Sequence, residues 1–218
     1  MITIQIDDRS INIPEGWEDV TTEKYFQLVK LLRVMKSDFD KARELREADL
    51  DDEALIVEEE WDTMSLSVKI SSIITGLSIE EIDNLSFEGF EQLCGILKFT
   101  SDPNADKIKK EEFSTIVDGE LNLGFKPFSN RSTAEASMQN KLANRYSGDQ
   151  DIDKRIIGQL AVMLRPYDVV KLPSGEDTIK WHQFDKEMIP YYGNLLSELP
   201  ITNILYWNDF FLTTQKDS

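Results

Sequence analysis

The chain has 218 residues, and its 41 acidic side chains outnumber its 24 Lys and Arg residues to give a net charge of −17. A field of this sign repels the phosphates of nucleic acids and the headgroups of anionic lipids, so direct binding to DNA or RNA is disfavoured. Because 40% of the residues are hydrophobic, the composition excludes a disordered chain and predicts a folded core.

Signals for membrane insertion or secretion are not expected. No stretch approaches the roughly 18 consecutive apolar residues of a transmembrane helix, so we expect no membrane association. Acids interrupt the first ten residues, and we expect no signal peptide there. The single cysteine, Cys94, excludes an intrachain disulfide and predicts a buried, reduced thiol, which fits a reducing cytoplasm.

The first 14 residues predict a β-hairpin, because isoleucines alternate with polar residues on both sides of a polar turn. Thr21 is then a candidate N-cap for a core helix. The apolar residues that follow it at helical spacing are Tyr25, Leu28, Val29, Leu32 and Met35. Trp17 precedes the cap and is expected to cover the first turn of this helix.

Residues 37–62 form an acidic segment with twelve acids and three bases, which is more than half of the net charge. We interpret the segment as a solvated helical excursion or a loop between two packed helices; the alternative is a docking surface for a basic partner. The spacing of Asp49, Asp51 and Glu53 lacks the glycine turn and the final bidentate Glu of a calcium loop, so no calcium site is predicted.

Three helices are predicted after this segment. The first carries an apolar stripe and ends at the C-cap candidate Gly76. Ser78 and Glu81 form a capping box for a short second helix, and a third begins after Ser86. The stripe of the first of these helices consists of Leu66, Ile70, Ile73 and Ile74. The stripe of the third consists of Phe87, Phe90, Leu93, Cys94 and Leu97.

The second half of the chain predicts further hairpins and helices. Alternating apolar residues around a Val-Asp-Gly-Glu turn predict a hairpin over residues 116–125. A helix or a partly ordered segment is predicted up to Tyr146, and a helix is predicted over residues 151–164, stopped by Pro166. A third hairpin is predicted over residues 168–181.

The C-terminal stretch predicts two short helices divided by Pro200, both rich in aromatic residues. At helical spacing, Ile204, Trp207 and Phe211 share one face, and Tyr206 and Phe210 share a neighbouring face. Burial is the commoner fate of such aromatics. If one face packs inward, Tyr206 and Phe210 are the candidate contacts with a protein partner.

No residue pattern predicts a catalytic, cofactor or metal site, and we expect no enzyme. His182 has neither a nucleophile nor an orienting acid at a recognisable spacing, which favours a surface or capping role. The segment Pro-Ser-Gly-Glu-Asp-Thr lacks the Lys-Ser pair of a phosphate-binding loop. Asp151 and Asp153 fit the start of a helix for dipole reasons alone.

Together the elements predict an α+β fold that is mainly α-helical with small peripheral β-hairpins. Residues 1–100 would hold the N-terminal hairpin and a helical region with the acidic insertion 37–62. Residues 101–218 would hold the second hairpin and the helical C-terminal region. We expect these two regions to pack as one unit.

Several of these pieces, taken in order, resemble proteins encoded among the tail and virion morphogenesis genes of bacteriophages that infect Bacteroidetes and related hosts. The stretches that carry the resemblance are IPEGWEDVTTEKYFQL, KISSIITGLSIEEIDNLSFEGFEQL, the middle hairpin, IIGQLAVMLRPY and LPITNILYWNDFFL. They are similar to tail assembly chaperones and baseplate hub assembly proteins. The acidic segment 37–62 departs from that pattern because it is longer and more charged.

The resemblance implies a non-enzymatic role in tail or virion assembly, as a chaperone of a tail component. Its partners would be tail or other virion proteins, its location the host cytoplasm or the virion, and no catalytic residue is implied. Two alternatives stay open. One is a structural component of the virion, and the other is an acidic host-takeover protein that mimics nucleic acid and binds a basic host protein.

Overall fold

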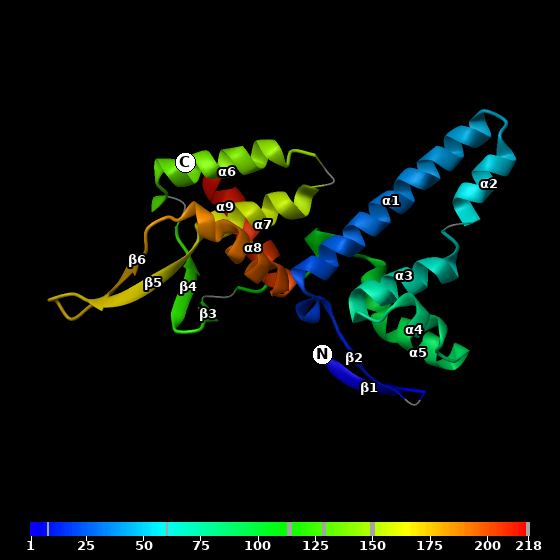
Figure 1. Cartoon of the computed structure of the whole chain (residues 1–218), viewed down its shortest axis with the longest axis horizontal. Helices are drawn as coiled ribbons and strands as arrows, with labels where there is room; N and C mark the ends of the chain where they lie inside the picture. Colours follow the sequence, from blue (N-terminus) through cyan, green and yellow to red (C-terminus); the bar gives the residue numbers. More distant parts are fainter. Residues whose placement is uncertain (8, 60, 113–114, 128–129, 149–150, 217–218) are drawn as a thin grey trace. The chain divides into compact units, whose positions relative to one another are not determined.

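The computed structural model describes part of the chain in full and part as backbone only. The described residues are 1–7, 9–59, 61–112, 115–127, 130–148 and 151–216, with the backbone alone for residues 105 and 211–216. The chain forms two compact units, an N-terminal unit (Met1–Ile108) and a C-terminal unit (Lys109–Ser218). Both contain helices and an antiparallel sheet (Figure 1), which confirms the predicted mainly helical α+β class. That the two regions pack as one unit stays a prediction.

The N-terminal unit begins with the predicted hairpin. Strands β1 (Ile2–Ile6) and β2 (Arg9–Ile13) pair antiparallel, and Ile6, Ile11 and Ile13 are buried on the side that faces the core. Alternation of apolar and polar residues is what aligns these isoleucines on one face.

Helix α1 (Thr22–Glu47) starts where predicted, with the backbone N–H of Lys24 donating to Thr21 Oγ1 at 3.4 Å. Tyr25 is buried, and Trp17 meets its ring edge-on at 5.5 Å between centroids, which confirms that Trp17 covers the first turn. The helix is longer than expected, because it continues through residues 37–47 of the acidic segment.

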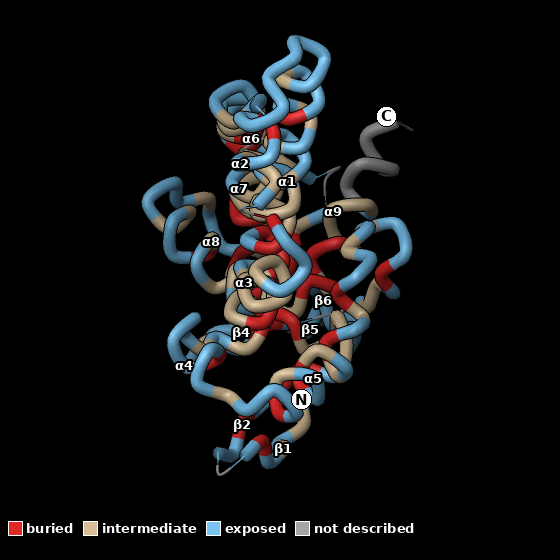
Figure 2. The backbone as a smooth tube through the Cα atoms, turned by 90° about the vertical axis from the view of Figure 1, so that its right-hand side faces the viewer, coloured by how far each residue is buried: buried red, intermediate tan, exposed pale blue. Residues whose placement is uncertain are grey.

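The rest of the acidic segment forms α2 (Asp51–Glu59), which packs against the second half of α1. The indole N–H of Trp61 donates to Asp38 Oδ2 at 2.9 Å, and Arg46 Nη2 lies 2.6 Å from Glu58 Oε2. Of the two structures proposed for the acidic segment, the helical one is therefore correct. Its connecting turn is exposed in Figure 2.

Excision of residues 37–62, with a short Gly-Ser bridge, is expected to leave the N-terminal unit folded, because Tyr25, Phe26 and Leu28 lie outside the excised part. The excision removes Asp62, the N-cap of the next helix, which accepts from the Met64 N–H at 2.8 Å. Loss of this cap should lower the free energy of unfolding by about 1 kcal/mol. Thermal unfolding followed by far-UV circular dichroism should show one cooperative transition. A molten or insoluble product would instead place Trp61, which is 9% exposed, in the core on which the unit depends.

The next helices, α3 (Thr63–Thr75), α4 (Ile79–Asp83) and α5 (Phe87–Ile96), follow the predicted capping signals. Gly76 ends α3 with a φ of 83°, and Ser78 and Glu81 form the predicted capping box. The side chain of Ser86 caps α5 by accepting from the Gly89 N–H at 3.0 Å.

The predicted apolar stripe of α5 is partly wrong. Leu93 is buried, but Phe87 is 68% exposed and Cys94 is only half-buried. The rotation of the helix explains this, because a Cβ at Gly89 would lie 2.6 Å from Ile6 Cγ2. Gly89 thus lies against the hairpin, and the exposed Phe87 lies away from that face.

The C-terminal unit contains a four-stranded antiparallel sheet in the order β3 (Ile116–Asp118), β4 (Leu121–Phe125), β5 (Leu164–Lys171) and β6 (Asp177–Trp181). The two hairpins were predicted, but their union was not: β4 pairs with β5, with Phe125 opposite Leu164. Pro166 lies inside β5 instead of stopping the preceding helix. Its carbonyl accepts from the His182 N–H at 3.1 Å, so the missing proline N–H removes only one bond of that pair.

Helices α6 (Thr133–Arg145), α7 (Ile152–Met163), α8 (Ile189–Glu198) and α9 (Ile201–Lys216) complete this unit and confirm the predicted helices. Its largest fully buried apolar side chains come from strands and helices alike: Leu123, Met163, Leu164, Leu196, Ile201 and Ile204. Across the described parts of both units, no helix is long and apolar enough to cross a bilayer.

Candidate functional site

The predicted contact residues Tyr206 and Phe210 belong to an aromatic cluster on α9. Trp207 stacks on Phe125 with 4.6 Å between ring centroids, and Tyr206 and Phe210 each meet Trp207 edge-on at 5.5 Å. Phe210 is 41% exposed, whereas Tyr206 and Trp207 are half-buried. The sequence placed Trp207 on a different face from the other two, but the structure brings all three rings together. We call Phe125, Tyr206, Trp207 and Phe210 the α9 aromatic cluster.

Polar groups border this cluster along the segment that precedes β3. Burial raises the pKa of Tyr206, and the neighbouring Glu112 carboxylate adds to this by its charge and by a hydrogen bond. Lys110 forms an ion pair with Asp209, and the Asn203 amide donates to the Glu111 carbonyl at 3.0 Å. An apolar centre with a charged rim has the anatomy of a protein contact surface.

A second apolar surface, which the sequence analysis missed, lies on the β5–β6 hairpin. The strand register places Tyr167 opposite Trp181 and Val169 opposite Ile179, all on one face. Val169 is 59% exposed and Ile179 is 52% exposed. In Figure 1 the hairpin, yellow to orange, extends away from the helices of its own unit. We call these four residues the hairpin face.

The inner end of the hairpin face is anchored in the unit. The rings of Tyr167 and Trp181 lie 5.4 Å apart and pack over β4 at Gly124, where a Cβ would be 3.0 Å from Tyr167 Cε1. The exposed pair Val169 and Ile179 thus lies next to two aromatic rings that are packed against β4. The sequence predicted a hairpin over residues 168–181, but no local pattern tells an exposed face from a covered one.

His182 lies on the opposite face of the same hairpin. Its Nε2 is 3.2 Å from Asp168 Oδ2, and the two side chains are 42% and 62% exposed. The sequence analysis found no acid for this histidine, and the structure supplies one across the strand pair. The ring partner is a surface carboxylate and not a nucleophile, which agrees with the surface role favoured for His182.

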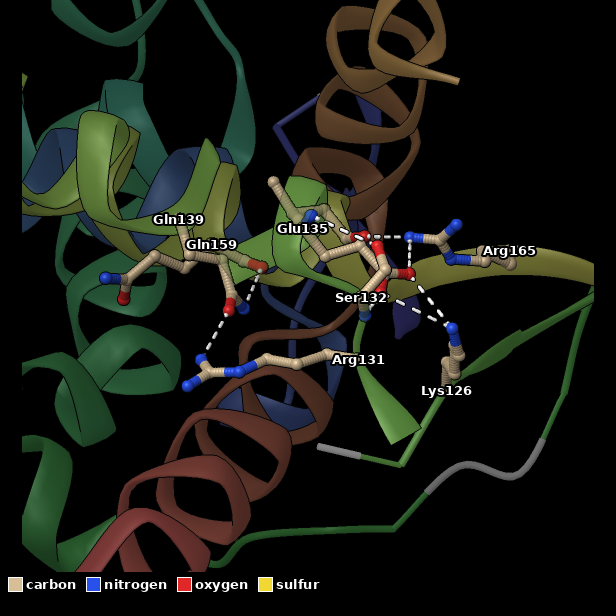
Figure 3. Close-up of polar contacts among 8 residues, drawn as sticks. Lys126, Arg131, Ser132, Glu135, Gln139, Gln159 and Arg165 are labelled. Atoms are coloured by element: carbon tan, nitrogen blue, oxygen red, sulfur yellow. Dashed lines mark hydrogen bonds and ion pairs between the residues drawn. The ribbon is translucent and has the colours of Figure 1, made fainter. Parts of the chain in front are cut away.

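Buried charges gather where α6 meets the sheet (Figure 3). Glu135 is fully buried, with Oε1 2.5 Å from Arg165 Nη2 and 3.2 Å from Lys126 Nζ, and it accepts from the Ser132 N–H. Burial acts to raise the pKa of Glu135, but the hydrogen bonds from Ser132, the charge of Arg165 and the hydrogen bond from Lys126 outweigh it and lower the pKa. A carboxylate held ionised in this way is unsuited to donate a proton near neutral pH, so we assign the cluster a structural role.

The thiol of Cys94 is half-buried beside a small cavity. Cys94 borders a cavity of about 170 Å³ between α3 and α5, and burial raises the pKa of its thiol. A raised pKa disfavours the thiolate, which is the nucleophilic form. Within the described residues, no group of three or more His, Cys, Asp or Glu side chains is placed to hold a metal ion.

Comparison of the chain with protein-family models, with curated proteins and with solved structures finds no match. Its function must therefore be argued from the two apolar surfaces of the C-terminal unit and from the acidic helical hairpin of the N-terminal unit.

Proposed function

We propose that this protein is not an enzyme and acts through protein–protein contacts, with the hairpin face as its main contact surface. The observation that carries the proposal is the exposed pair Val169 and Ile179 on a projecting hairpin. Lys171 lies opposite Asp177 at the outer end of the same face, so the apolar pair has a charged border. Exposed apolar surface with a polar rim is typical of interaction sites.

The edge of the sheet supports a specific mode of contact. Strand β6 is an outer strand of the sheet. The bonds from the His182 N–H to the Pro166 carbonyl and from the Leu172 N–H to the Glu176 carbonyl identify the hydrogen-bonded pairs of the hairpin. By the antiparallel pattern, the backbone groups of Ile179 and its second neighbours then point away from β5. A partner strand added there would gain main-chain hydrogen bonds, and Ile179 would contribute specificity.

The resemblance to tail assembly chaperones supplies the proposed partner class. We propose that the partner is a phage tail or other virion protein whose apolar surface is covered in the host cytoplasm until it assembles. The α9 aromatic cluster, with Tyr206 and Phe210, would be a second contact surface of the same unit. A permanent place in the virion is the alternative, and a high copy number in purified particles, measured by mass spectrometry, would favour it.

A double variant of the hairpin face tests the proposal. Val169→Ser with Ile179→Ser is expected to abolish capture of the virion partner from infected-cell lysate, because both aliphatic anchors are lost. Since both side chains are exposed, the free energy of unfolding should change by less than about 0.5 kcal/mol. The measurement pairs affinity capture and mass spectrometry with a chemical-denaturant melt.

Val117→Ser is the matched control, because Val117 is 70% exposed on the opposite edge strand of the same sheet. This variant should keep the partner. The proposal fails if the double variant captures the same protein as the wild type, or if the wild type captures no virion protein.

A further inference from the structure

We propose that the outward face of α2 is a separate docking site whose occupant is a lysine- and arginine-rich amphipathic segment of a partner protein. The site lies in the N-terminal unit and does not depend on the hairpin face. Its apolar part is the pair Leu55 and Ile56, and its charged part is the set of carboxylates around that pair.

The two sides of α2 differ in what covers them. The side that meets α1 is formed by Ala54, Val57, Glu58 and Trp61, which are buried or half-buried. The opposite side carries Leu55, which is 51% exposed, and Ile56, which is 63% exposed. By the helical repeat, Asp52 and Glu59 lie on this same outward side. Two large aliphatic side chains therefore occupy the solvent face of a nine-residue helix.

The outward pair is not needed to hold the helical hairpin together. Trp61 binds Asp38 through its indole N–H, and Lys69 Nζ lies 4.1 Å from the centre of the Trp61 ring. Arg46 pairs with Glu58, which is on the side that faces α1. All these contacts form without Leu55 or Ile56, so the structure of the hairpin does not explain the outward pair.

The charges around the pair select the kind of partner. Residues 51–62 contain seven acids and no base. Among the described acids of α2, only Glu58 has an ion-pair partner within the described chain. A purely apolar partner would strip water from Asp52 and Glu59 without compensation, whereas lysines or arginines flanking an apolar stripe would pair with them.

The apolar pair also separates this proposal from mimicry of nucleic acid. A surface that imitates phosphates needs carboxylates alone, and its binding would depend on charge and not on the pattern of apolar residues in the partner. Leu55 and Ile56 instead call for an amphipathic partner helix whose apolar residues recur at i, i+3, i+4 and i+7.

The experiment uses the full chain and two labelled synthetic peptides of leucine and lysine with identical composition. One peptide has the amphipathic helical pattern, and the other is scrambled so that the pattern is lost. By fluorescence anisotropy at about 0.15 M salt, the patterned peptide is expected to bind at least about tenfold more tightly than the scrambled one. Leu55→Ser with Ile56→Ser should weaken its binding by about tenfold or more.

Two further variants keep the result interpretable. Asp52→Asn with Glu59→Gln removes charge without touching the apolar pair, and should weaken binding and reduce its salt dependence. Val117→Ser, in the other unit and outside both proposed contact surfaces, should leave peptide binding unchanged. Circular dichroism and thermal melts establish that each variant is folded.

Equal affinity for the patterned and scrambled peptides would overturn the proposal in favour of charge alone. Undiminished binding after the change of Leu55 and Ile56 would overturn it as well. If that variant does not fold, undiminished binding by the Asp52 and Glu59 variant has the same meaning, because the occupant is defined by its basic residues.

Discussion

Glu135→Ala is expected to destabilise the C-terminal unit by about 3–5 kcal/mol, because it leaves the charge of Arg165 buried without its anion. Arg165 is only 3% exposed, and its Nε already lacks a hydrogen-bond partner among the described residues. Chemical-denaturant unfolding followed by tryptophan fluorescence measures the loss, since Trp181 and Trp207 both belong to this unit.

Two further variants serve as comparisons for Glu135→Ala. Glu187→Ala is the matched control, because that side chain is 79% exposed and pairs with Lys186 only at the surface; it should cost less than about 0.5 kcal/mol. Glu135→Leu combined with Arg165→Met removes both charges and should cost less than Glu135→Ala alone. Similar losses for Glu135→Ala and Glu187→Ala would show that the cluster contributes no more than a surface pair.

The pH dependence of the stability that Glu135 contributes has a defined sign. The pKa of Glu135 in the folded protein lies below the ordinary glutamate value of 4.5. A lowered pKa means that ionised Glu135 adds stability at pH above 4.5, and that this contribution is lost as the pH falls through the folded-state pKa. The stability difference between the wild type and Glu135→Gln should therefore be largest near neutral pH and shrink in acid.

Trp207→Ala is expected to destabilise the same unit by about 3–5 kcal/mol, because this ring joins Phe125, Tyr206 and Phe210. Tyr206→Ser with Phe210→Ser should cost less, about 1–3 kcal/mol, since each ring loses one edge contact with Trp207. This second variant should also lose capture of the proposed virion partner, because it removes the aromatic anchors at the surface.

Denaturant melts and affinity capture on both variants separate the two roles of the α9 aromatic cluster. Equal losses of unfolding free energy would mean that Tyr206 and Phe210 serve the core as much as Trp207 does. Partner capture by the Tyr206 and Phe210 variant at the wild-type level would remove these residues from the contact surface.

Local signals in the sequence predicted most elements, because caps and alternation act over a few residues. Thr21, Ser78 and Ser86 each cap the helix that they were expected to cap. The rotation of a helix is not local in this sense. Phe87 is exposed because the approach of β1 to Gly89 sets the buried face of α5, and that approach is a tertiary contact.

The candidate surfaces were harder to predict than the elements. The spacing of Ser132 and Glu135 was a readable capping-box signal. No residue near them in the sequence, however, indicated that Arg165 would form an ion pair with the Glu135 carboxylate. Tyr206 and Phe210 were identified from helical spacing, whereas the hairpin face depends on which parts of β5 and β6 the helices leave uncovered. Such exposure follows from the assembled unit and not from either strand.

The pairing of β4 with β5 is the least local contact of the sheet, since α6 and α7 both lie between Phe125 and Leu164 in the chain. Bringing the ends of a long connection together costs conformational entropy, and that cost falls when the connection is already compact. The Gln139 amide, which donates to the Gln159 carbonyl at 3.4 Å, joins α6 to α7 within this connection. Pairing of β4 with β5 is thereby coupled to the packing of α6 on α7. A substitution that weakens this helix contact should therefore destabilise the strand pair, although it changes no residue of either strand.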